Sequence, residues 1–389
     1  MKVMILGFGG VGSVLAKLLA KEKEIEEIIC GDIKFNFRIK DKKVSLKYLN
    51  ILDKNKFLIF LNKHKPDIVI NTSLPKFNLK IMETCFKVGV NYIDTASYWD
   101  FDSNPKAKVP YKMEQLDFDK RFKKAGITGL INAGVSPGLT NLIAKECADK
   151  LDEVDFVKIR LVEDTASNEL FFSWNKDWLI DEIGFKPLVY YNHKFKIMES
   201  FSGEEEFTFP KPIGKKKVYY FCQDEVGSLP LFIKTKNLDV KAYDNNIEVS
   251  KLLVKLNLTS EKEIKLGKCK IRPKEFLSKI LQDSPPGYER KFKNSIFAIS
   301  IEAIGRHNKK KKIVKYSVVF PKQKEIDKMN LGANFISYPT ALSIKLFVMN
   351  FFKIIKKGVF PPECIGKEIR KEILIELEKS RVYISKANG

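Results

Sequence analysis

The first twelve residues constrain the fold of this chain more than any other segment. A short apolar strand at residues 3–6 runs directly into the pattern G-x-G-x-x-G, with glycines at positions 7, 9 and 12. In this pattern Gly7 permits a tight turn, Gly9 lets the backbone approach a pyrophosphate, and Gly12 lets the next helix pack closely on the strand. The amides at the N-terminus of that helix face the phosphate. The segment therefore predicts a dinucleotide site.

The residues that follow make this pattern specific. Apolar residues with helical spacing occupy 14–19, and a second apolar run at 25–30 ends in Gly31-Asp32. Asp32 lies twenty residues beyond Gly12, where an acid at the tip of the second strand accepts hydrogen bonds from an adenosine ribose. A strand, turn and helix without a ligand is the weaker interpretation. The residues expected to contact the dinucleotide are Gly7, Phe8, Gly9, Gly10, Val11, Gly12, Asp32 and Ile33.

The order of elements in the first part of the chain predicts an α/β fold. The next predicted strands are 44–46, 67–71, 91–94 and 128–132, and the predicted helices are 50–64, 79–88, 113–125 and 139–151. This alternation is typical of a Rossmann-type, doubly wound parallel sheet. We assign residues 1–150 to a dinucleotide-binding domain. A polar loop at 97–112 is long enough to have a function of its own.

From about residue 153 the pattern changes to alternating runs separated by turns. The predicted strands are 155–162, 217–221, 297–304 and 312–320, with helices at 247–256 and 273–281. These runs predict a second, α+β domain at 151–330, built on a mostly antiparallel sheet. The lysine run 309–312 is read as a hairpin turn.

The last segment, 331–389, is predicted to be helical with a break at 358–363. Its apolar stretch at 341–355 carries Lys345 and Lys353 and is too short for a membrane span. We interpret that stretch as an amphipathic helix packed against the core.

Composition excludes several classes of function. The net charge is +22, but only eight of the 70 basic residues are arginine and the lysines are spread along the chain, which favours a solvated basic surface over a nucleic-acid site. The six cysteines form no C-x-x-C pair and the chain has three histidines, so we expect reduced thiols and no metal site. No signal peptide is recognised at the N-terminus. We therefore expect a cytoplasmic protein without a membrane or nucleic-acid partner.

Several segments together resemble the saccharopine dehydrogenase family, which includes lysine 6-dehydrogenase and carboxynorspermidine dehydrogenase. They are GFGGVG at 7–12, NTS at 71–73, YIDTASYW at 92–99, FKKAGITGLINAGVSPGLTNLIA at 122–144, RPKEFL at 272–277 and GVFPPE at 358–363. The resemblance runs through nearly the whole chain in the same order. It implies that the second domain, 151–330, serves substrate binding and dimerisation in a homodimer. It also implies a C-terminal segment that packs back on the first domain.

The resemblance also implies the chemistry. Family members transfer a hydride between a nicotinamide and the carbon of an amine, so that amine and imine interconvert. The expected function is thus that of an NAD(P)-dependent oxidoreductase acting on a C–N bond of a lysine-like amino acid or its keto-acid adduct. The alternatives are a carboxynorspermidine-type imine reductase in polyamine synthesis and a non-catalytic nucleotide-binding protein on the same fold.

Site residues in the first domain follow from the matching segments. Asn71, Thr72 and Ser73 end a central strand, where open α/β sheets bind ligands, and the resemblance places them against the cofactor. Asp94 and Tyr98 are the candidate catalytic residues, because a carboxylate stabilises a developing iminium and a tyrosine relays protons. Thr95 is expected to bind substrate. A strand-end turn and a loop cap are the alternative roles.

The remaining candidates are weaker. The resemblance places Val135, Ser136 and Pro137 beside the nicotinamide, Pro137 suits a first helical turn, and Gly138 allows close approach to a ring. Some relatives carry aspartate where this chain has Ser136, which weakens transfer of an exact substrate. In the second domain the resemblance points to Trp174 as a substrate contact. Further candidates there are Asp181, Glu182, 223–225 and 228–230, with Arg160 or Arg272 as a carboxylate clamp.

The identity of the cofactor depends on charge near the ribose. Asp32 would repel a 2′-phosphate, which favours NAD. Lys34 and Arg38 are close enough in sequence to neutralise such a phosphate, so NADP stays open.

Overall fold

The computed structural model describes residues 1–97, 113–165, 176–281 and 291–388. Tyr98, Trp174 and most of the polar loop at 97–112 therefore lie outside the described residues. The chain divides into two compact units. Unit 1 comprises 1–146, 227–233 and 337–380, and unit 2 comprises 147–226, 234–336 and 381–389.

Unit 1 is built on a parallel sheet of seven strands in the order β17-β6-β5-β4-β1-β2-β3. The strands are β1 (Lys2–Leu6), β2 (Glu27–Asp32), β3 (Val44–Tyr48), β4 (Ile68–Asn71), β5 (Asn91–Asp94), β6 (Thr128–Leu130) and β17 (Gly358–Phe360). All pairs are parallel, so the carboxyl ends of the strands lie at one edge. The prediction of a doubly wound parallel sheet is confirmed.

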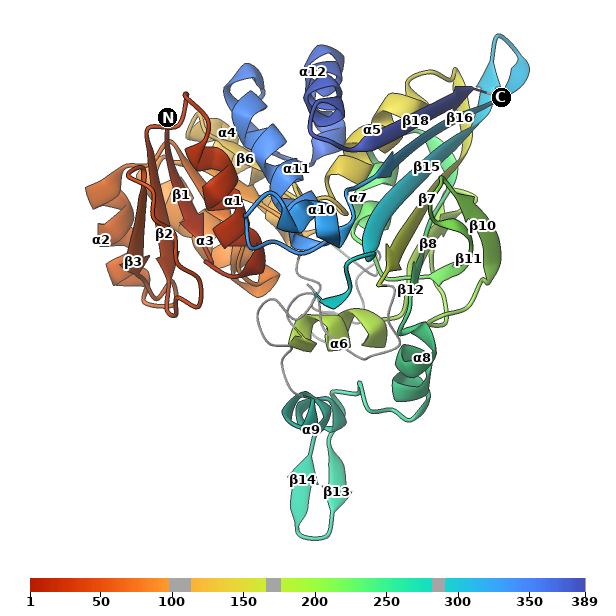
Figure 1. Ribbon diagram of the computed structural model, residues 1–389, viewed down its shortest axis with the longest axis horizontal. Coiled ribbons are helices and arrows are strands. Elements are labelled where there is room, and N and C mark those ends of the chain that lie inside the picture. Colours follow the sequence, from red (N-terminus) through yellow and green to blue (C-terminus); the bar gives the residue numbers. More distant parts are fainter. Residues whose placement is uncertain (98–112, 166–175, 282–290, 389) are drawn as a thin grey trace. The chain divides into compact units, whose positions relative to one another are not determined.

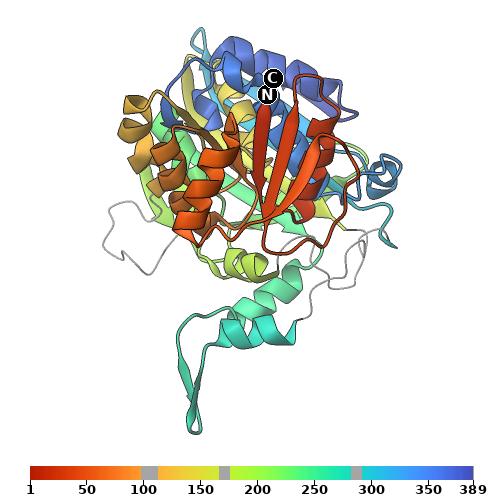
Figure 2. The same cartoon turned by 90° about the vertical axis from the view of Figure 1, so that its left-hand side faces the viewer.

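Helices flank this sheet because its strands are apolar on both faces. They are α1 (Gly10–Ala20), α2 (Lys54–His64), α3 (Asn78–Val88), α4 (Asp119–Lys124), α5 (Leu139–Ala148, which continues into unit 2), α11 (Ser337–Asn350) and α12 (Lys367–Glu378). Helix α1 packs against α11, which in turn contacts α12, while α2 packs against α3 (Figure 1). Figure 2 shows the first three strands side by side in red.

Helix α11 differs from its prediction. The apolar stretch was expected to be amphipathic, but eleven of its fourteen residues are buried. The reason is that α1 covers one side of α11 and α12 covers another, which leaves little of its surface to solvent. Among the described residues, no helix combines the length and apolar character needed to cross a membrane.

Unit 2 is built on a mixed sheet with the order β10-β11-β12-β7-β15-β16-β18 and two further strands, β8 and β9, beside β12. The strands are β7 (Glu153–Asp164), β8 (Leu188–Tyr191), β9 (Lys194–Ile197), β10 (Glu205–Phe209), β11 (Gly214–Tyr220), β12 (Thr235–Asp244), β15 (Ile296–His307), β16 (Lys310–Val319) and β18 (Tyr383–Asn388). Only the β12–β7 pair is parallel. The mostly antiparallel second sheet is as predicted.

The other elements of unit 2 are short. They are α6 (Lys176–Gly184), α8 (Ile247–Lys255), α9 (Pro273–Ile280), α10 (Gln323–Asp327) and the hairpin of β13 (Ile264–Leu266) and β14 (Cys269–Ile271), while α7 (Glu225–Phe232) begins in unit 2 and continues into unit 1. Asn308 and Lys309 connect β15 to β16 with positive φ angles. The predicted turn is therefore shorter than 309–312, because Lys310 already pairs in the ladder.

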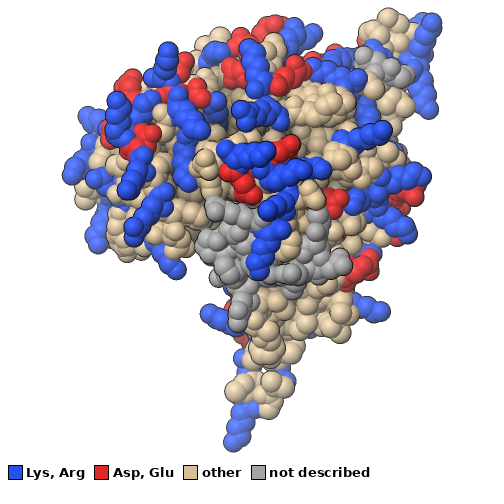
Figure 3. All heavy atoms as spheres, viewed as in Figure 1, with Lys and Arg blue, Asp and Glu red and all other residues tan. Residues whose placement is uncertain are grey.

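The C-terminal segment contains the helices α11 and α12 in unit 1, but it also contains two strands that were not predicted. It contributes β17 to the sheet of unit 1 and β18 to the sheet of unit 2. The predicted break at 358–363 contains β17, because these residues pair with β6 at the edge of the sheet. On the face shown in Figure 3, basic side chains are spread over the surface with acidic ones among them.

Candidate active site

The glycine-rich turn lies at the switch point of the seven-stranded sheet. β1 is flanked by β2 on one side and by β4 on the other, so the connections diverge there and open a crevice beyond the carboxyl ends of the strands. Helix α1 begins directly after the turn, with Gly9 as its N-cap and no side-chain cap or acidic residue in its first turn. Its first amides are thus left without a side-chain acceptor, as a phosphate site requires.

The glycines of the turn have different reasons to be glycine. Gly7 has a φ of +95°, and a Cβ there would come within 2.7 Å of the Ser73 backbone nitrogen. A Cβ on Gly12 would overlap the Gly7 carbonyl oxygen and the Thr72 hydroxyl. A Cβ on Gly9 or Gly10 would meet nothing within 4 Å. Gly7 and Gly12 are therefore required by the packing around them, and the open space at Gly9 and Gly10 fits a bound pyrophosphate.

Asp32 is held in place beside this turn at the tip of β2. Its Oδ2 accepts a hydrogen bond from the backbone N–H of Phe8 at 2.6 Å. Its Oδ1 accepts from the N–H of Ile33 at 2.6 Å and from that of Lys34 at 3.1 Å. These bonds orient the carboxylate, and Oδ2, which accepts one of them, keeps acceptor capacity for a ribose hydroxyl. The structure thus brings the predicted ribose ligand next to the predicted phosphate turn.

The loop after β4 joins the same site, but its side chains bond mainly within the protein. The Thr72 hydroxyl donates to the Gly7 carbonyl oxygen at 2.8 Å. The Asn71 side chain is 1% exposed; it donates to Asn78 Oδ1 at 2.7 Å and accepts from the Ser73 amide and hydroxyl. Asn71 therefore shapes the loop rather than presenting its side chain to a ligand, while Thr72 and Ser73 stay partly exposed.

Asp94 is buried at the end of β5. Its carboxyl is 1% exposed, accepts from the Asn132 N–H at 2.7 Å and from Gln115 Nε2 at 3.3 Å. Burial raises the pKa of Asp94 to about 7, although the hydrogen bonds from Asn132, Gln115 and Tyr92 oppose the shift. The carboxyl joins the end of β5 to the end of β6. This geometry matches the alternative role of a loop cap.

The predicted nicotinamide loop at 134–138 folds tightly on itself. Gly138 has a φ of +132°, and a Cβ there would overlap the Gly134 backbone. Gly138 is thus required by the turn itself, whereas close approach to a ligand ring was expected. Pro137 precedes α5 and is not part of its first turn. Ser136 is the partly exposed residue of the loop, and Thr95 is adjacent, since its carbonyl oxygen faces Gly134.

Both candidate clamp arginines of unit 2 form ion pairs with acids of the chain. Arg160 is fully buried and bonds Asp239 at 2.6 Å and Glu205 at 2.7 Å. Arg272 forms ion pairs with Glu263 and Glu275 on the surface. The buried ion pairs of Arg160 thus do not support a clamp role for it, whereas Arg272 stays an untested candidate on the surface.

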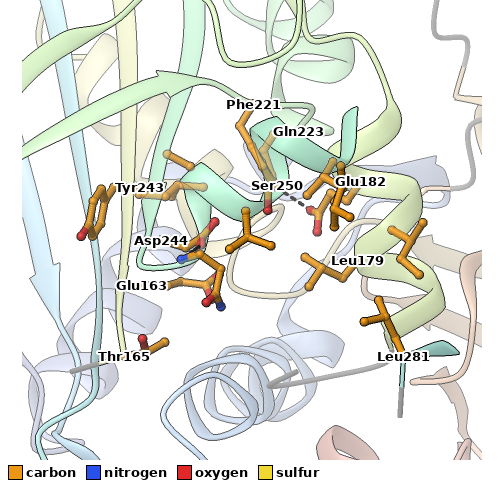
Figure 4. Close-up of a pocket in the computed structure, with 17 residues that line it drawn as sticks. Glu163, Thr165, Leu179, Glu182, Phe221, Gln223, Tyr243, Asp244, Ser250 and Leu281 are labelled. Carbon is orange, nitrogen blue, oxygen red and sulfur yellow. Dashed lines mark hydrogen bonds between the residues drawn. The ribbon is translucent and has the colours of Figure 1, made fainter. Parts of the chain in front are cut away.

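Two other candidates from the sequence meet in a pocket of unit 2. Gln223 donates to Glu182 Oε1 at 2.9 Å, and both residues line a pocket that is open to solvent (Figure 4). Glu163 and Asp244 also line it but were not identified from the sequence. The available signal was an acid at or next to the end of an apolar strand, a pattern too common to single them out. Asp181 instead pairs with Lys274.

Comparison with known proteins decides the family. Residues 3–130 match the model of the saccharopine dehydrogenase NADP binding domain, and residues 134–382 match that of the saccharopine dehydrogenase C-terminal domain. The chain belongs to the saccharopine dehydrogenase family. It is an oxidoreductase of that family and binds a nicotinamide cofactor. The resemblance seen in the sequence is confirmed.

Two named relatives are similar in sequence to most of this chain. The chain is 29% identical over 315 residues to carboxynorspermidine synthase of Vibrio cholerae, covering 74% of this chain and 75% of that protein. It is 28% identical over 300 residues to carboxyaminopropylagmatine dehydrogenase of Synechocystis, covering 72% of each.

Two solved structures share the fold of this saccharopine dehydrogenase family member. Saccharopine dehydrogenase (L-Glu forming) of Saccharomyces cerevisiae has a TM-score of 0.70 at 14% identity and full coverage of both chains. The homospermidine synthase of Legionella pneumophila, solved in complex with NAD, has a TM-score of 0.68 at 14% identity, covering 99% of this chain and 91% of that one. At this identity the likeness concerns the fold alone.

Proposed function

We propose that this protein catalyses hydride transfer at a C–N bond, reducing the imine of a primary amine to a secondary amine. The observation that carries the proposal is the turn after β1, whose open face at Gly9 and uncapped helix start lie beside Asp32. The two named relatives make, or act on, carboxylated polyamines, which favours the carboxynorspermidine-type alternative. A lysine-like amino acid or its keto-acid adduct, as in lysine metabolism, is the second candidate and is supported by the family itself.

The chain's residues divide the work as follows. The amides of α1 bind the pyrophosphate, and Asp32 accepts hydrogen bonds from the ribose. Thr72 and Ser73 hold the glycine turn against β4, and Ser136 and Thr95 border the far end of the crevice. The reduced nicotinamide supplies a hydride to the imine carbon while a proton is added at the nitrogen. Asp94 acts as a positioning residue that fixes the ends of β5 and β6.

We propose further that NAD is preferred over NADP. The support is the carboxylate of Asp32, whose charge next to the ribose opposes a 2′-phosphate. Lys34 and Arg38 are the residues that would compensate for this repulsion if NADP were used.

Two broader predictions accompany this function. None of the six cysteines, all of which lie among the described residues, forms a disulfide, which supports action in a reducing compartment such as the cytoplasm. Apolar side chains exposed on β13, α8 and α9, among them Leu266, Leu252 and Phe276, support a homodimer formed through this surface. Unit 1 is proposed as the dinucleotide domain and unit 2 as the substrate domain.

The decisive experiment follows the absorbance of reduced nicotinamide with the full chain. Imines are supplied as a primary diamine with an amino acid that bears a side-chain aldehyde, and as lysine with a 2-oxo dicarboxylic acid. Oxidation of NADH or NADPH that depends on the amine supports the proposal, and the preferred pair names the substrate class. Binding of cofactor without turnover on any pair would favour a nucleotide-binding protein without catalytic activity.

A further inference from the structure

The pocket of unit 2 has an acidic lining that the rest of this basic chain does not share. The chain has 70 lysines and arginines against 48 acids. The described residues that line the pocket nevertheless include Glu163, Glu182 and Asp244, and none of them is a lysine, arginine or histidine. Because the lining has no cationic side chain, we expect the positive charge that would balance these acids to come from a ligand.

The three acids surround the space from different elements. Glu163 on β7 and Asp244 on β12 are partners in the parallel register of these strands, and Glu182 comes from α6. In Figure 4 Glu163 and Asp244 lie together, and Glu182 lies across the space from them, beside Gln223. The pocket can therefore offer carboxylate oxygens to a bound group from two sides.

None of these acids has a cationic partner among the described residues. Glu182 accepts from Gln223, and Asp244 accepts from the Asn246 N–H at 2.5 Å. Within the described part of the chain, Glu163 forms neither a side-chain hydrogen bond nor an ion pair. An unpaired carboxylate in such surroundings is costly unless it is protonated or neutralised.

The neighbouring acids outside the pocket behave differently. Asp164 follows Glu163 and pairs with Lys216 at 2.8 Å. Asp181 precedes Glu182 and pairs with Lys274. The chain therefore neutralises its acids immediately outside the pocket and leaves those inside without a lysine. This contrast is local, so it does not follow from overall composition.

The carboxyls of all three acids have raised pKa values. Burial raises the pKa of Glu182 to about 8, and nearby Asp224 adds to the shift. Burial raises the pKa of Asp244 to about 6, and that of Glu163 well above its ordinary value, with Asp244 and Glu182 contributing. A positive ligand between them would lower all three, because an adjacent opposite charge favours the ionised form.

An independent feature points to the same kind of ligand. Ser250 on α8 is 7% exposed and lines the pocket, yet its hydroxyl bonds no described residue. Acceptors therefore converge on the space from a serine and from carboxylates, a set that suits the N–H groups of an ammonium. Phe221, Leu179 and Leu253 line the remainder, and such apolar walls fit a methylene chain.

We propose that this pocket binds the protonated amino-alkyl end of the substrate, a primary alkylammonium such as the free end of a diamine. The inference deepens the proposed function, on which it rests, by naming the part of the substrate that unit 2 selects. It also means that the carboxylate of a 2-oxo acid or amino acid does not bind here, because the acids would repel it.

A binding experiment tests this pocket without relying on turnover. Calorimetry on the full chain uses diaminopropane as the cationic probe and glutarate as an anionic one, in two buffers of different ionisation enthalpy. We expect the diamine to bind with release of protons, as the carboxyls ionise, and glutarate not to bind. Glu163→Gln and Asp244→Asn should each weaken diamine binding by roughly 10- to 100-fold.

Glu206→Gln is the matched control. Glu206 lies in unit 2, is 61% exposed and pairs with Lys215 on the surface, so its removal changes charge equally without touching the pocket. Wild-type diamine affinity is expected for this variant. Circular dichroism and unchanged NADH affinity show that each variant is folded, and Glu163→Gln should not lower the unfolding midpoint because the amide replaces a carboxyl that is protonated in the unliganded protein.

The outcomes separate the pocket from the proposed function. Diamine affinity that is equal in wild type, Glu163→Gln and Asp244→Asn, or a preference for glutarate, overturns the pocket assignment even if imines are reduced. Diamine binding that depends on these acids supports the assignment, and absence of turnover in the same protein would then count against the proposed function alone. In active protein, the KM for the amine should rise in both variants while the KM for NADH stays constant.

Discussion

At the scale of single residues, the turn after β1 separates packing from binding. Gly12 faces the Gly7 carbonyl oxygen and the Thr72 hydroxyl, whereas Gly9 faces open space. Both are glycines of one short pattern, and the sequence assigned them roles by position. The structure shows that neighbouring atoms leave no room for a side chain at Gly12 and that no atoms do so at Gly9.

Substitution of these glycines by alanine should therefore have opposite effects. Gly12→Ala should destabilise unit 1 by about 2 kcal/mol or more, because the new methyl overlaps backbone. Gly9→Ala should leave the unfolding midpoint near that of wild type and weaken cofactor binding by roughly tenfold or more, about 1.4 kcal/mol. Thermal unfolding and calorimetry with NADH measure the two effects. Equal loss of stability in both variants would contradict this division.

Asp32 gives a prediction on cofactor choice. Asp32→Asn keeps a side-chain oxygen as acceptor but removes the charge that opposes a 2′-phosphate. We expect the ratio of kcat/KM for NADPH to that for NADH to rise by roughly tenfold. The control is Asp41→Asn, an acid in the same region that caps only the Lys43 amide. An unchanged ratio in Asp32→Asn would remove Asp32 from the cofactor site.

Asp94 gives a prediction on pH. Burial raises its pKa from 3.8 to about 7, so between these values the folded state holds a proton that the unfolded state has lost. The free energy of unfolding contributed by this group therefore falls as pH rises through that window. Asp94→Asn cannot ionise, and its stability relative to wild type should improve from about pH 5 to about pH 8. Urea unfolding across pH checks this; a difference independent of pH would refute it.

At the scale of elements, strands that bury polar residues could not be predicted from the sequence. β12 lies between β7 and β11 near the centre of the second sheet, yet it was not predicted. Its Asp239 and Lys241 are buried because they bond Arg160 and Glu205. Partners distant in sequence make these charges tolerable, so no local pattern of apolar residues reveals the strand.

β17 and β18 escaped for a different reason. β17 has three residues and is followed by two prolines, so locally it looks like a break. It becomes a strand because the edge of β6 offers unpaired backbone groups, which is tertiary information. The long, periodic helices and the apolar parallel strands were predictable because their signal is local.

β18 leads to a prediction on stability. It pairs with β16 over six residues and covers the backbone edge of that strand. Deletion of residues 381–389 should lower the unfolding midpoint by roughly 4–8 °C, corresponding to about 2 kcal/mol, and increase aggregation through the bared edge. Tyr383→Ala serves as control, since that side chain is 59% exposed. An unchanged midpoint in the deletion variant would show that β18 is dispensable.

At the scale of the whole molecule, the family and the cofactor turn were accessible from sequence, whereas the acidic pocket was not. The turn is one continuous segment with fixed spacing. The pocket brings together Glu163, Glu182 and Asp244, which are up to 81 residues apart in sequence. The inference that it binds a cation also depends on the lack of lysines in its lining. Only the fold shows that.

The proposed homodimer can be tested on the exposed surface of unit 2. Leu266→Glu replaces a side chain that is 64% exposed on β13. We expect light scattering to give the mass of two chains for wild type and of one chain for the variant, at equal thermal stability. Ile59→Glu, at a site 66% exposed on α2, should remain dimeric. A monomeric wild type would refute the proposal.

The chain alternates between its two units, returning to unit 1 at residues 227–233 and again at 337–380. During translation, the edge strand β17 is therefore synthesised only after nearly all of unit 2 has been made. Until then the nascent seven-stranded sheet lacks its last member beside β6 and the helix that covers α1. Neither unit can finish folding while the chain is still being made, because unit 1 needs residues 337–380 and unit 2 needs residues 381–389. Both units are therefore completed only when the C-terminal segment has been synthesised.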